Sequence, residues 1–120
     1  MKKEVNEIVK PIVLTDTETK ERYTLEFNKE SVYFAEQRGF DIDEVAKRPM
    51  TLIHDFFFYA FRMHHKNISR QKTDRILDEE IGGIGALPEG FIERLYLLYQ
   101  APFEGVVVKD GKNSKIQIEL

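Results

Sequence analysis

Three histidines are the residues of this chain best suited to metal or acid–base chemistry. His54, His64 and His65 fall in an apolar segment, residues 51–66, which we expect to be helical. At about 1.5 Å per residue, His54 and His65 would stand about 16 Å apart along the helix axis, too far to share one metal ion. His64 and His65 are adjacent and would diverge around the helix. Because the chain also has no cysteine, we expect no metal site and interpret the pair as a polar helix end.

Carboxylates and hydroxyls that could support catalysis are scattered along the chain. The acidic pairs Asp41/Asp43 and Glu79/Glu80 have the spacing of solvated faces. No serine stands in the strand–turn–helix context that a hydrolase nucleophile requires. We therefore expect a protein that is not an enzyme and that needs no cofactor.

Two further patterns could contact phosphate groups. The glycine-rich stretch 82–85 contains GxG, but it follows a predicted helix and lacks the remainder of a nucleotide-binding motif, so we interpret it as a hinge or loop. Lys66, Arg70, Lys72 and Arg75 could contact the backbone of a nucleic acid, yet acidic residues follow them immediately. The net charge of −3 adds no attraction. A small nucleic-acid-binding regulator is therefore kept as an alternative function.

The elements that would position these residues indicate one α+β domain over residues 1–120. Its core should span roughly 8–104, with a strand-like or flexible tail over 105–120. The alternation of Tyr23, Leu25 and Phe27 with polar residues predicts an N-terminal β-hairpin, with strands over 8–14 and 22–27. About four helices should follow, and the candidate helical segments lie within 28–39, 41–47, 51–66, 69–81 and 88–102. Asn28, Asp41, Thr51 and Ser69 are the expected N-caps.

The segment 51–66 is also the most aromatic part of the chain, with five rings in six positions. It is apolar on nearly all sides, which is typical of a helix at the centre of a core. Part of this surface exceeds what a small domain can cover, and Tyr and Phe are enriched where proteins meet. We expect the surplus to bind another protein or a second copy of the chain. The predicted protein-binding residues are Phe58, Tyr59, Phe61, Tyr96 and Tyr99.

The N-terminal residues and the length of the apolar segments indicate the cellular compartment of the protein. The basic start at residues 1–3 is followed by Glu4 and Asn6 where a signal peptide would need an apolar run. No stretch approaches the roughly 18 apolar residues of a membrane span. We expect a cytoplasmic protein without disulfides and without a membrane partner.

Parts of the sequence resemble small prophage proteins of tailed phages that infect Gram-positive bacteria, namely the tail assembly chaperones. The likeness runs from about residue 23 to 99. It is carried by the segment YTLEFNKESV at 23–32, by Glu36, by Gly39-Phe40, and by the pattern Phe57, Ala60-Phe61 and His64-His65-Lys66.

This resemblance implies a non-catalytic cytoplasmic protein that is absent from the mature virion. Such a chaperone coats the long tape-measure protein, keeps its helices soluble, and yields to tail-tube subunits as the tail polymerises. A groove that binds an amphipathic helix would suit that task. A minor structural or connector protein of the virion is the other alternative, and it would be present in purified particles.

Overall fold

The structure is a computed structural model that describes residues 9–104, 117 and 119. It begins with an antiparallel hairpin of β1 (Ile12–Thr15) and β2 (Arg22–Leu25), in which Ile12 faces Leu25 and Thr15 faces Arg22. Helices and their connecting turns make up most of the other described residues, so the predicted α+β fold with an N-terminal hairpin is confirmed. The predicted tail over 105–120 lies outside the described residues, apart from 117 and 119.

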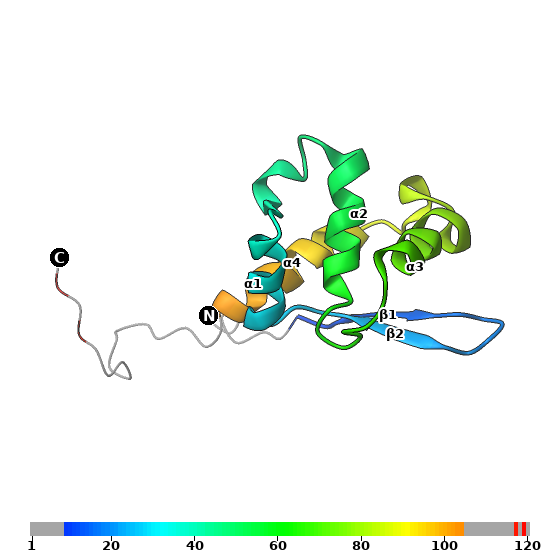
Figure 1. The fold of residues 1–120 in the computed structure, drawn as a ribbon, viewed down its shortest axis with the longest axis horizontal. Helices are drawn as coiled ribbons and strands as arrows, with labels where there is room; N and C mark the ends of the chain where they lie inside the picture. The colour runs from blue at the N-terminus through cyan, green and yellow to red at the C-terminus, as the bar shows by residue number, and fades with distance from the viewer. Residues whose placement is uncertain (1–8, 105–116, 118, 120) are drawn as a thin grey trace.

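Seven helical elements follow the hairpin (Figure 1). The four α-helices are α1 (Lys29–Gln37), α2 (Pro49–Ala60), α3 (Arg70–Arg75) and α4 (Phe91–Glu104). The short elements are the 3₁₀ turn η2 (Ile42–Glu44), the π-helix η3 (Ile76–Ile81), which continues α3, and the 3₁₀ turn η4 (Ile84–Ala86).

Side-chain capping begins α1, η2 and α3 where the sequence predicts it. Asn28 Oδ1 accepts a hydrogen bond from the Ser31 amide at 2.8 Å, and the Ser31 hydroxyl accepts one from the Asn28 amide at 2.9 Å. These two bonds form a reciprocal capping box, which satisfies amides that the first turn leaves free. Asp41 and Ser69 accept equivalent bonds from Asp43 and Lys72.

Both boundaries of α2 differ from the prediction. α2 begins at Pro49, in the first helical turn, and not after a Thr51 cap. Proline suits this position because its missing N–H would have no partner there. α2 also ends at Ala60, whose carbonyl accepts a bond from the Glu26 amide of the hairpin at 3.0 Å. Residues 61–66 therefore form turns, not the end of a helix.

The end of α4 also differs from the prediction. The helix continues through Pro102 to Glu104, while the sequence predicts an end near the proline. The element after Asp41 is shorter than expected, because only the three residues of η2 are helical.

β2 and the residue that follows Leu25 are joined to the end of α2 and to the segment after it. The Thr24 amide donates to Nε2 of His65 at 2.9 Å, and the Glu26 amide donates to Ala60 as described above. Figure 1 shows the hairpin along one side of the helices, with α1 and α4 near one end and α3 near the other.

The core is a cluster of aromatic rings around α2. Phe56 is fully buried, and its ring centroid lies 5.4 Å from both Phe40 and Tyr96 and 5.8 Å from both Phe27 and Tyr99. The pairs with Tyr96 and Tyr99 are edge-to-face, an arrangement that aromatic rings prefer. The hairpin, α1, α2 and α4 are thus packed around one centre. None of the helices in the described ranges is long and apolar enough to cross a membrane.

Candidate protein-binding groove

Three of the five predicted protein-binding residues are buried in the core, so the prediction that they present a surface is wrong. Phe61 has no exposed area, because Tyr23 of the hairpin packs against it with ring centroids 5.6 Å apart. Tyr59 is covered by Phe40 at 5.5 Å, and Tyr99 by Phe27 at 5.1 Å. The hairpin and the segment after α1 cover sides of α2 and α4 that helical periodicity alone leaves open.

The two remaining predicted residues are half-buried and lie in different settings. Phe58 packs beside Tyr59, with centroids 5.2 Å apart, whereas Tyr96 packs edge-on against Phe56 at 5.4 Å. The five residues therefore do not form one exposed patch.

The exposed aromatic pair of the described chain is instead Tyr33 of α1 and Phe103 of α4. Their side chains are 52% and 50% exposed, and their ring centroids lie 6.0 Å apart. They border a groove of about 440 Å³ between the two helices, which we call the α1–α4 groove. Its lining residues are Val32, Tyr33, Glu36, Ile42, Tyr99, Gln100, Phe103 and Glu104.

A hydrogen bond across the α1–α4 groove fixes the spacing of its two helices. The Tyr99 hydroxyl donates to Oε2 of Glu36 at 2.9 Å. Burial, followed by the hydrogen bond to Glu36, raises the pKa of Tyr99 well above its usual value. The phenol therefore stays protonated and remains a donor at physiological pH.

The charges around the groove are of one sign. Glu36 and Glu104 are the charged residues of its lining, and both are acidic. A largely apolar trough with carboxylates at its border fits the apolar stripe of a helix flanked by Lys or Arg. The sequence does not indicate Phe103 as a binding residue, because the predicted helix ends at Pro102. It does not indicate Tyr33 either, because the helical spacing of α1 identifies only the residues on its buried side.

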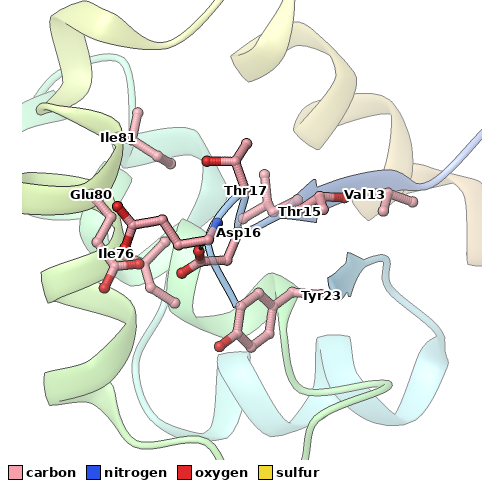
Figure 2. Close-up of a pocket in the computed structure, with 10 residues that line it drawn as sticks. Val13, Thr15, Asp16, Thr17, Tyr23, Ile76, Glu80 and Ile81 are labelled. Carbon is pink, nitrogen blue, oxygen red and sulfur yellow. Dashed lines mark hydrogen bonds between the residues drawn. The ribbon is translucent and has the colours of Figure 1, made fainter. Parts of the chain in front are cut away.

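A second hollow, of about 570 Å³, lies between the hairpin turn and η3 (Figure 2). Figure 2 shows Ile76, Glu80 and Ile81 of η3 on one side, with Asp16 and the hairpin on the other. The Asp16 carboxylate accepts hydrogen bonds from two amides of its own turn, at 2.8 and 3.0 Å. Those bonds lower the pKa of Asp16. The Asp16 carboxylate thus stabilises the turn of the hairpin.

The histidines are distributed among separate partners. His64 Nε2 lies 2.8 Å from Glu26, and His65 accepts from the Thr24 amide, so both contact the hairpin and do not form a polar helix end. His54 lies between the Met50 carbonyl at 2.9 Å and Asp78 at 2.7 Å. Within the ranges that the structure describes, no three metal-ligating side chains are grouped.

The basic residues proposed to contact phosphates are partly neutralised. Arg70 bonds to Asp55 at 2.7 Å and to Asp74 at 2.9 Å. Lys72 lies over the Tyr23 ring, 5.8 Å from its centroid. This arrangement leaves Arg70 with little charge to offer a phosphate backbone.

Comparison with known proteins gives a family and no relative. No curated protein matches the chain, and no solved structure matches it. A protein-family model matches residues 1–120. The chain therefore belongs to the family described as a domain of unknown function, DUF5055.

Proposed function

We propose that this protein is a phage tail assembly chaperone that binds the tape-measure protein during tail morphogenesis. It acts by binding and not by catalysis, in the cytoplasm of the host, and yields its place to tail-tube subunits as the tail grows. The α1–α4 groove, with Tyr33 and Phe103 half exposed at its border, is the observation that supports this proposal most directly.

The apolar character of the groove suits a helical partner. A helix docks in a groove through side chains spaced three and four residues apart, and Val32, Ile42 and the two exposed rings offer a matching apolar surface. Eight described residues line the groove, whereas a stable protein interface uses about 20–30 residues on each side. Each copy should therefore bind weakly, and many copies along one long helix would bind together. Weak binding per copy also allows displacement by tube subunits.

The acidic border of the groove adds a requirement for the partner's sequence. Glu36 and Glu104 would lie beside the residues that flank the partner's apolar stripe. Lys or Arg at those flanking positions would be attracted, whereas Asp or Glu would be repelled.

Co-expression with a tape-measure-like protein of the same phage or prophage tests the proposal. Size-exclusion chromatography with light scattering should show several copies of this protein on each long chain. The groove variant Tyr33→Ser/Phe103→Ser should weaken that association at least tenfold, because it removes the two exposed rings. The control variant Met50→Ser/Leu97→Ser removes two exposed apolar side chains that do not line the groove, and it should bind normally.

Three results would contradict the proposal. The first is no association with the long chain, and the second is equal loss of binding in the groove and control variants. The third is recovery of this protein in purified particles, which would indicate a minor structural or connector protein of the virion.

A further inference from the structure

The Phe34 ring of α1 lies between two arginine side chains. The guanidinium carbon of Arg38 is 3.8 Å from the ring centroid, and that of Arg62 is 3.9 Å from it. Two guanidinium groups this close to one centroid must occupy opposite faces, since they would overlap on a single face. Arg38 lies one helical turn after Phe34, and Arg62 comes from the turn after α2. We call this group the Phe34 clamp.

Neither arginine of the Phe34 clamp is neutralised within the described part of the chain. The arginines that form ion pairs there are Arg48 and Arg70. Nε of Arg62 is buried and has no hydrogen-bond partner among the described residues. Because this atom is buried, an anion from outside can be bound only through other N–H groups of the two arginines, such as their terminal Nη groups.

Stacking fixes the direction in which the two arginines can bind. Each guanidinium uses one flat face for the ring, which leaves N–H groups at its edge directed away from that contact. The edge of an aromatic ring is itself electropositive. Two positive charges on either side of one ring also repel each other, and an anion between their edges would relieve this repulsion.

We propose that the Phe34 clamp binds an oxyanion, and that this oxyanion is the carboxylate of an Asp or Glu side chain on a protein partner. Arg38 and Arg62 donate hydrogen bonds from the two sides of the ring, and the ring edge contacts the anion between them. Arginine is suited to this task because its planar donors match the two oxygens of a carboxylate.

The surroundings favour a single carboxylate over a nucleic-acid strand. Binding of a nucleic-acid strand requires a row of unpaired cations. Arg70, the next arginine after Arg62 in the sequence, is already paired with Asp55 and Asp74. The chain as a whole carries a net charge of −3. The Phe34 clamp faces α2, whereas the α1–α4 groove lies along α4, so this proposal does not depend on what occupies the groove.

Side-chain NMR of the full chain tests the proposal. The arginine Nε–Hε signals are followed while a blocked tetraglutamate peptide is added at constant ionic strength. The signals of Arg38 and Arg62 should shift and saturate in the millimolar range, and those of Arg48 should not. Arg38→Gln should weaken binding at least tenfold. Arg48→Gln is the matched control, because it removes an exposed arginine that pairs with Glu44 and should leave binding unchanged.

Other probes separate the remaining outcomes. Arg38 is exposed, so the backbone amide spectrum of Arg38→Gln should match that of the unaltered protein. Non-saturating shifts, or equal binding by the two variants, would overturn the proposal. A single-stranded 12-nucleotide DNA that binds at least tenfold more tightly than the peptide, and weakens steeply with salt, would assign the clamp to nucleic acid and also overturn it.

Discussion

At the scale of single residues, His65 joins the loop after α2 to the hairpin through one hydrogen bond. Its Nε2 can accept from the Thr24 amide only while the ring is neutral. Burial first, and the neighbouring charge of His64 second, lower the pKa of His65 below its usual 6.5. His54 behaves in the opposite way. Burial is its largest single influence and lowers its pKa, but the bonds to Asp78 and Met50 together outweigh burial and raise it.

We expect His65→Ala to destabilise the protein by about 1–2 kcal/mol at pH 7.5, because the Thr24 amide would lose its partner. Since the folded-state pKa is lowered, this contribution is fully present above pH 6.5 and is lost as the pH falls through the folded-state value. The difference between the variant and the unaltered protein should therefore shrink from pH 7.5 towards pH 5. Urea unfolding at several pH values measures it.

His54→Ala is the control of opposite sign. Its folded-state pKa is raised, so the stability that His54 contributes is present below pH 6.5 and is lost as the pH rises. A constant effect of His65→Ala at every pH would show that protonation does not compete with the bond to Thr24.

At the scale of elements, local signals locate helix starts better than helix ends. Asn28, Asp41 and Ser69 act as caps because a side chain can satisfy nearby amides whatever the rest of the chain does. The end of α2 was not predictable in this way. It depends on the bond between Ala60 and Glu26, which lie 34 positions apart in the sequence.

Asn28→Ala should destabilise the protein by about 1 kcal/mol, because it removes the side chain that accepts from the Ser31 amide. The substitution also breaks the reciprocal half of the capping box. Thermal and urea unfolding followed by circular dichroism would measure the loss. Asn67→Ala, in an exposed turn, is the matched control and should change stability by less than about 0.5 kcal/mol. Equal effects would argue against the capping box as a source of stability.

At the scale of the whole molecule, the aromatic rings hold the hairpin, α1, α2 and α4 to one centre. Phe56 is fully buried and packs against Phe27 after the hairpin, Phe40 after α1 and Tyr96 of α4. A cavity at this position cannot be filled by the movement of one flexible side chain. Its cost should therefore be near the upper end of the usual range for core substitutions.

We expect Phe56→Ala to destabilise the protein by about 3–5 kcal/mol, through lost burial and the cavity that remains. A small domain has only about 5–15 kcal/mol of stability, so part of the population should unfold at 37 °C. Urea unfolding with intrinsic tyrosine fluorescence would show the shift. Met50→Ala, at a side chain that is 73% exposed, should have little effect. A small effect of Phe56→Ala would mean that the rings repack.

The sequence predicted the fold class more fully than the surface. Alternation at 23–27 and the cap at Asn28 are local signals, and the structure confirms both the hairpin and the helix start. The surplus rings were assigned to the surface by helical periodicity, which does not show that Tyr23 covers Phe61. Tyr33 and Phe103 come from segments 70 residues apart, and their proximity depends on how α1 meets α4. The candidate groove therefore could not be predicted from local sequence patterns.

The bonds that join β2 to the residues after α2 also limit how copies of this protein can aggregate. The Thr24 and Glu26 amides are already committed within the chain, so, among the described residues, β1 is the side of the sheet to which a foreign strand can add. If two molecules paired through β1, each would cover the open edge of the other's described sheet. Strand pairing would then stop at a closed dimer, and it could not propagate into a fibre.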